Sequence, residues 1–301
     1  MDYFPNDEEL SLLKFIAKYQ YLKSSDVSYF FNTKRYYQAR ITRLTNAHYI
    51  IRNKGYLTLD KKGIKLIKGF NFEYTKKNRN KDYQKRLAYI SHIAAFYNNT
   101  NNFTFTPSYL MKSKEAHTNT SRKFMGTFEI KGFDYLVYHI SSENDKRYIT
   151  SVLGDIQKEK NYKNIIIITN NINKLNIYDF TFGYNSVLLI EDTDDNLEHL
   201  KYIHNVNWPK IVHDNFTHTS LSEYSFCDYT DHRKKFISTF YFLDTEKINK
   251  INISLRENRN KDFYIICTNT LKNELQKYLP NVTYKIIELE NYIEKQQNIY
   301  N

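Results

Sequence analysis

Residues 33–59 read TKRYYQARITRLTNAHYIIRNKGYLTL, and the first half of this stretch has the apolar spacing of a helix that ends near Ala47. Its inward face is predicted to hold Tyr37, Ile41, Leu44 and His48. Two β-rich runs follow, Tyr49–Arg52 and Tyr56–Leu59, and the Asn53-Lys54-Gly55 turn between them indicates a hairpin. The stretch therefore predicts a helix followed by a β-ribbon.

Two further helices are predicted upstream. Asn6 or Asp7 can cap the first, and Glu8 and Glu9 place in its first turn the charge that a helix N-terminus favours. A second start signal, Ser24-Ser25-Asp26, leads into an aromatic segment. The buried stripe of the first helix is predicted to be Leu10, Leu13, Phe15, Ile16 and Tyr19. Three helices and a hairpin, in this order, predict a winged helix-turn-helix domain over residues 1–72.

The positive charge of the chain is segregated. Residues 1–90 contain 19 Lys and Arg against 8 Asp and Glu, whereas residues 91–301 contain 25 of each sign. A basic region beside a neutral remainder is typical of a polyanion-binding module joined to another domain. A basic composition can also serve solubility alone, but uniform drift would not leave two thirds of the chain balanced.

The third helix is the predicted recognition element, because it carries four basic residues and no acidic one. The major groove admits one helix, whose N-terminal and outward residues reach base edges. We expect base contacts first from Arg35 and then from Gln38 and Arg43, with phosphate contacts from the ribbon and the segment after it. The predicted DNA-binding residues are Lys34, Arg35, Tyr36, Gln38, Arg43, Arg52, Lys54, Lys61 and Lys62.

Two other interpretations of this surface stay open: a solvated helix face, and a winged helix that docks a protein.

A connector is predicted over residues 73–125. It begins with a basic run at residues 76–81 and continues with a helix whose apolar residues recur through Leu87, Ile90, Ile93, Ala94 and Tyr97.

The C-terminal part predicts an α/β region, so that the whole chain is of the α+β class. Domains are expected at 126–210, nuclease-like but inactive, and at 211–301, as a second α/β unit. Strand, helix and strand alternate in both, which implies mainly parallel pairing. Residues 166–171 align with 265–270 at an offset of 99, which leaves open whether the two are repeats. The expected strands are Phe133–Ile140, Asn164–Thr169, Ser186–Glu191, Phe236–Leu243, Phe263–Thr268 and Tyr284–Leu289.

The sequence predicts no catalytic residue, metal site or cofactor. It has no glycine-rich phosphate loop, and the pairs His199/His204 and His213/His218 are spaced five apart, which is poor for joint metal binding. Restriction-type nucleases place Glu-x-Lys after an Asp on the preceding strand. Here Glu129-Ile130-Lys131 precedes Asp134. The acidic run Asp192, Asp194 and Asp195 is predicted to cap the helix that follows it.

Two cysteines, Cys227 and Cys267, support no disulfide framework and suit a reducing cytoplasm. The longest apolar runs, such as Ile165–Ile168, are far too short to span a membrane, so no membrane partner is expected.

The domain order resembles the plasmid replication-relaxation family, with an N-terminal winged helix, a basic connector and a nuclease-like α/β domain without its catalytic set. The resemblance implies a sequence-specific double-stranded DNA-binding protein, expected to be a homodimer. It would act in plasmid or phage replication, mobilisation, conjugative transfer or transcription control, and a plasmid replication or transfer protein is a further expected partner. Two alternatives are a divergent Mg²⁺-dependent nuclease and an antitoxin or adaptor that represses its own promoter.

Overall fold

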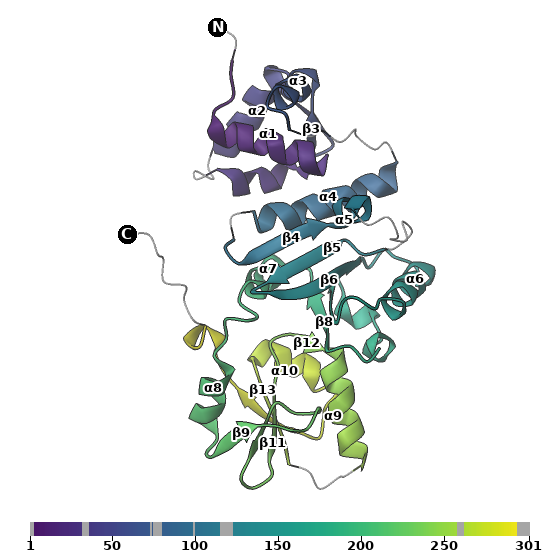
Figure 1. Cartoon of the computed structure of the whole chain (residues 1–301), viewed down its shortest axis with the longest axis vertical. Helices are drawn as coiled ribbons and strands as arrows, with labels where there is room; N and C mark the ends of the chain where they lie inside the picture. The colour runs from purple at the N-terminus through teal and green to yellow at the C-terminus, as the bar shows by residue number, and fades with distance from the viewer. Residues whose placement is uncertain are drawn as a thin grey trace. The chain divides into compact units, whose positions relative to one another are not determined.

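The computed structural model describes residues 3–31, 36–72, 74, 80–98, 100–114, 123–257 and 262–293. It divides the chain into two compact units, Met1–Pro107 and Ser108–Asn301. The fold mixes helices with several sheets (Figure 1). The finer division expected from the sequence, at residues 72, 125 and 210, stays a prediction.

The first unit, purple to blue in Figure 1, begins with a helix and a small sheet. Strand β1 pairs with β3 and β3 pairs with β2, both antiparallel. The second predicted helix is a 3₁₀-helix, η1, and the third is described from its Tyr37 onward. The elements are α1 (Asp7–Tyr19), β1 (Leu22–Lys23), η1 (Ser24–Phe30), α2 (Tyr37–Asn46), β2 (Ile50–Asn53), β3 (Tyr56–Leu59), α3 (Lys61–Gly69), α4 (Lys81–Phe96) and β4 (Phe103–Pro107).

Helix α1 begins where the sequence predicts. The Asn6 side chain accepts from the Glu9 backbone N–H, and the Glu9 carboxylate accepts from the Asn6 N–H, which makes a capping box. The predicted inward stripe is largely confirmed, but it omitted Leu12, which is fully buried, while Leu10 is only half-buried.

The tight turn between β2 and β3 is formed by Lys54 and Gly55. Both residues have positive φ, 48° and 82°, as a two-residue type I′ hairpin requires. The prediction for His48 is wrong: α2 ends at Asn46, so His48 leaves the helical face and is exposed, with its Nδ1 3.5 Å from the Asp60 carboxylate. Ile41 and Leu44 are buried as predicted.

The predicted connector helix packs within the first unit as α4. Its apolar positions Leu87, Ile90 and Ile93 are buried, and the helix contacts η1, β1 and α1. The His92 Nδ1 of α4 lies 3.2 Å from the buried Asp26 carboxylate of η1.

In the second unit, one sheet places its strands in the order β12-β8-β7-β6-β5. The β5–β6 pair is an antiparallel hairpin, β6, β7 and β8 are parallel, and β12 is antiparallel to β8. Strand β7 is buried on both faces, as the Ile-rich run predicts. The elements are α5 (Ser108–Lys114), β5 (Gly126–Ile130), β6 (Phe133–Ile140), α6 (Lys146–Gln157), β7 (Asn164–Thr169), η3 (Ile172–Lys174), η4 (Ile177–Phe180), β8 (Ser186–Glu191), α7 (Asp194–Leu200) and β12 (Leu243–Asp244).

The other sheet has the order β14-β13-β11-β10-β9, with β11, β13 and β14 parallel and the β9–β10–β11 pairs antiparallel. Each sheet therefore contains three parallel strands, and the first of the three also pairs with an antiparallel strand. This antiparallel strand is β5, beside β6, in one sheet and β10, beside β11, in the other. Its elements and adjoining helices are α8 (Trp208–Asn215), β9 (Thr219–Leu221), β10 (Tyr229–Asp231), β11 (Phe236–Thr239), α9 (Thr245–Glu257), β13 (Phe263–Cys267), α10 (Asn269–Leu275), β14 (Thr283–Ile286) and η5 (Leu289–Asn291).

The chain passes from one sheet to the other between β11 and β12. The expected single strand Phe236–Leu243 is wrong, because β11 ends at Thr239 and β12 pairs with β8 of the other sheet. One apolar core cluster accordingly spans both sheets, from Ile165 and Ile167 to Phe236 and Ile265. Within the described residues, no helix combines the length and the apolar character needed to cross a lipid bilayer.

Candidate functional sites

Helix α2 turns a polar face outward from the first unit. Gln38, Ala39, Thr42, Arg43 and Asn46 are exposed, on the face opposite to Ile41 and Leu44. Tyr36, just before the helix, is 63% exposed. Two of the predicted contact residues, Lys34 and Arg35, lie outside the described residues.

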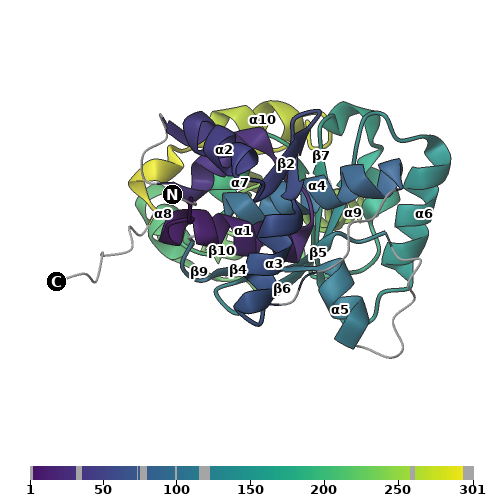
Figure 2. The same cartoon turned by 90° about the horizontal axis from the view of Figure 1, so that it is seen from above.

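The β2–β3 ribbon borders this face on one side. The Arg52 Nη1 donates to the Gln38 Oε1 at 3.5 Å, and Figure 2 shows α2 beside β2. The Lys54 side chain at the ribbon tip is exposed. The predicted base-reading and phosphate-binding residues are therefore adjacent here.

The start of α3 borders the same face on the other side. Lys62 lines one hollow together with Thr42, Arg43 and Asn46 of α2. Lys61 and Lys62 occupy the first turn of α3, and the Asp60 side chain caps this turn by accepting from the Lys61 backbone N–H at 2.7 Å.

Not every basic residue of α2 belongs to this surface. Arg40 makes an ion pair with Glu8 at 2.7 Å, and its guanidinium lies 4.5 Å from the Phe31 ring centroid. Arg40 therefore holds α1 and α2 together. Arg43 is exposed, but its guanidinium lies 5.6 Å from the ring centroid of Tyr3, a neighbour that the sequence analysis missed. Burial and the hydrogen-bonded Glu9 raise the pKa of Tyr3.

The β5–β6 hairpin contains the Glu129 and Asp134 carboxylates that the sequence analysis compared with those of a nuclease. Glu129 and Asp134 are cross-strand partners in β5 and β6, and both are exposed. Asp192 pairs with His139 at 3.6 Å, while Thr193 caps α7 in place of the predicted aspartates. Among the residues described, no three His, Cys, Asp or Glu side chains gather closely enough to hold a metal ion.

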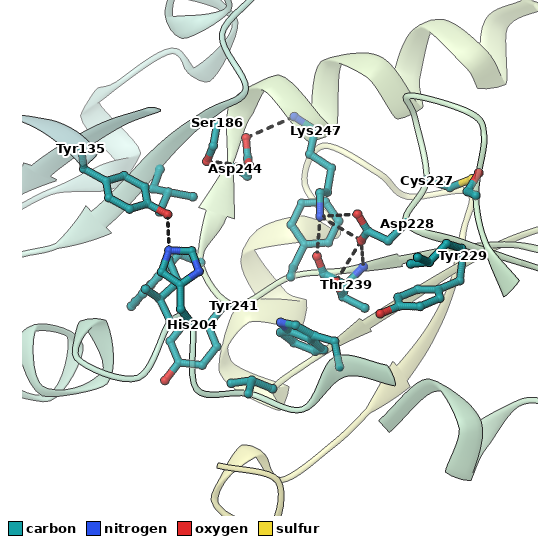
Figure 3. A pocket seen from close by; sticks show the side chains of 18 residues that line it. Tyr135, Ser186, His204, Cys227, Asp228, Tyr229, Thr239, Tyr241, Asp244 and Lys247 are labelled. Carbon is teal, nitrogen blue, oxygen red and sulfur yellow. Dashed lines mark hydrogen bonds and ion pairs between the residues drawn. The ribbon is translucent and has the colours of Figure 1, made fainter. Parts of the chain in front are cut away.

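The second unit contains a pocket that the sequence analysis did not predict (Figure 3). Asp228 before β10, Thr239 at the end of β11 and Lys247 in α9 meet there. The Lys247 Nζ lies 2.9 Å from the Asp228 Oδ2 and donates to the Thr239 carbonyl at 2.9 Å. The backbone N–H and the hydroxyl of Thr239 donate to the same Asp228 oxygen, at 2.7 and 2.9 Å.

A Tyr–His pair lies on another side of the pocket (Figure 3). The Tyr135 hydroxyl and the His204 Nε2 are 2.8 Å apart, and Phe133 stacks on the imidazole. Burial, together with nearby Lys131, lowers the pKa of His204, while burial raises that of Tyr135. Both groups are therefore neutral at pH 7. Residues so far apart in sequence carry no shared motif that could have revealed the pocket.

Cys267, at the end of β13, is expected to be chemically inert. It is fully buried, and burial raises the pKa of its thiol to about 12. At pH 8 roughly one thiol in ten thousand would be a thiolate, the reactive form. Peptide mapping after iodoacetamide treatment of the folded protein should find Cys267 unmodified, and treatment in denaturant should modify it. Alkylation of the folded protein at the rate of a free thiol would contradict its burial.

Comparisons with known proteins add little. No protein-family model matches the chain, and no curated protein does. Among solved structures, the chain is similar to protein VC1899 from Vibrio cholerae, at 12% identity and a TM-score of 0.22, over 64% of this chain and 48% of that chain. The chain thus spans about half the length of VC1899. Similarity at this level carries no argument about function, and the resemblance to the plasmid replication-relaxation family stays a prediction.

Proposed function

We propose that the first unit contains a winged helix-turn-helix and that the protein binds duplex DNA in a sequence-specific manner. The observation that carries the proposal is the continuity of one surface. The exposed face of α2 is bordered by Arg52 of the ribbon and by Lys62 of α3. A helix flanked by cations on both sides matches a major groove flanked by two phosphate backbones.

Each part of this surface has a separate role in the proposal. Gln38 and Arg43 read base edges in this proposal, where Arg suits guanine and Gln suits adenine. Arg35 is proposed as a further base contact, and Lys34 and Tyr36 as further DNA contacts, from the sequence alone. Phosphate contacts, which give affinity without sequence information, come from Arg52, Lys54, Lys61 and Lys62. Lys54 and Lys61 are exposed and Lys62 is half-buried, so the first two side chains are the more accessible to phosphate.

The cellular role is a proposal of the same kind. A DNA-binding unit joined to a charge-balanced α/β unit fits replication, transfer or transcription control of a plasmid or phage, with a homodimer recognising a symmetric site. The two sheets of the second unit, which share a strand arrangement, are proposed to be repeats of one ancestral β-α-β unit. In this proposal the second unit pairs subunits or binds a replication or transfer protein.

Fluorescence anisotropy with a labelled random-sequence duplex tests DNA binding by the full chain. The logarithm of the association constant should fall linearly with the logarithm of salt concentration, with a slope of about −0.9 for each phosphate contact. Four contacts would give a slope of about −3.6. A flat salt dependence, or no binding at 50 mM salt, would contradict the proposal.

A further inference from the structure

The pocket of the second unit has aromatic walls on several elements. Trp208 begins α8, Tyr229 begins β10, and Tyr241 follows β11. The cavity encloses about 620 Å³, within the range of sites that bind small organic ligands. Aromatic faces favour planar partners, because offset stacking adds to the burial of apolar area.

The charges of the pocket disfavour a phosphate. Of the described residues that line it, Lys247 alone is a full cation, and its ammonium is directed at Asp228 and at the Thr239 carbonyl. His204 adds no charge at pH 7, since burial lowers its pKa. The Asp244 carboxylate, in the same pocket, is already supplied with donors by the Ser186 hydroxyl and three backbone N–H groups.

The Asp228 carboxylate can accept a hydrogen bond from a ligand. The Asp228 Oδ2 accepts from Lys247 and twice from Thr239, whereas its Oδ1 accepts, among the described residues, from Lys247 at 3.1 Å. A carboxylate oxygen can accept two hydrogen bonds, so Oδ1 has room for another donor. The Asp228 side chain is 30% exposed, whereas Asp244, the other carboxylate of the pocket, is buried.

We propose that this pocket binds a planar heteroaromatic molecule with an exocyclic amino group, a nucleobase or nucleoside without phosphate. The amino group donates to Asp228, and the ring lies against Trp208. The site is separate from the proposed DNA-binding surface, and its test does not depend on DNA.

Isothermal titration of the full chain with adenine, cytosine, guanine and their nucleosides tests the proposal, with uridine and AMP as comparison ligands. At least one amino-bearing base or nucleoside should bind with 1:1 stoichiometry, at least tenfold more tightly than uridine and AMP. Comparing the affinity of each free base with that of its nucleoside shows which of the two is the ligand. No binding of any amino-bearing probe below 1 mM, or equal binding of uridine or AMP, would overturn the proposal.

Variants locate the site. Asp228→Asn should weaken binding at least tenfold and move the preference between adenosine and AMP towards AMP, because Lys247 loses its compensating charge. Trp208→Leu should weaken the binding of adenosine and of AMP alike, so that the preference between them does not change. If Asp228→Asn does not fold, Trp208→Leu alone tests the proposal. Glu223→Gln, an exposed acid outside the lining, should bind as the wild type does. Unchanged affinity in both folded pocket variants would overturn the assignment.

Discussion

The triple variant Arg52→Gln, Lys54→Gln, Lys62→Gln should bind duplex DNA roughly a hundredfold more weakly than the wild type at 0.15 M salt. Each phosphate contact contributes about 0.9 to the salt slope, so the loss of three should reduce its magnitude by about 2.7. The residues lie on the ribbon and at the start of α3, beside the exposed face of α2. Fluorescence anisotropy over a salt series measures both affinity and slope.

A matched control separates this local effect from net charge. Lys158, Lys160 and Lys163 are exposed residues of the second unit, and their replacement by Gln removes the same three charges. The control triple should keep a salt slope close to that of the wild type. If the two triples lose affinity equally, then the positive charge acts diffusely, and the α2 surface is not the binding site.

Gly63→Ala should reduce the local stability of the first unit by about 1–3 kcal/mol, the usual cost of inserting a carbon into a tightly packed site. A Cβ at residue 63 would lie 2.2 Å from the Tyr49 carbonyl oxygen, which also accepts the Asp60 N–H at 2.9 Å. In this variant, the backbone of α3 at residue 63 and the backbone at Tyr49 must therefore move away from each other. Hydrogen–deuterium exchange of peptides from residues 37–69 measures this unit by itself.

Gly69→Ala is the control for that substitution. Gly69 ends the same helix, and a Cβ there meets no atom within 4 Å. Ala has the higher helix propensity, so this variant should be neutral or stabilising, by less than about 1 kcal/mol. Equal exchange rates in the two variants would show that the close approach at Tyr49 does not constrain the fold.

The sequence was sufficient where the physical signal is local. The Asn6 cap and Glu9 place the start of α1, and the Lys54-Gly55 turn places the ribbon. The bounds of β6, β7 and β8 coincide with the predicted ones, because short apolar runs rich in β-branched or aromatic residues, bounded by polar turns, favour strands.

The sequence was insufficient where the outcome depends on distant residues. Phe240 and Phe242 continue the apolar pattern of β11, so periodicity could not reveal that the chain leaves that sheet and that β12 pairs with β8. The role of Arg40 depends on Glu8 of another helix. The pocket depends on the fold bringing Asp228, just before β10, to Lys247 of α9.

Site-specific photo-cross-linking tests the central claim, DNA binding through α2, most directly. Tyr36 in the full chain is replaced by p-benzoylphenylalanine, and the same replacement of Tyr178 in the second unit is the control, since both are exposed tyrosines. Irradiation with a labelled duplex should give a covalent DNA adduct at position 36 and little at position 178. No adduct at position 36, under conditions in which the duplex is bound, would contradict the placement of α2 against DNA.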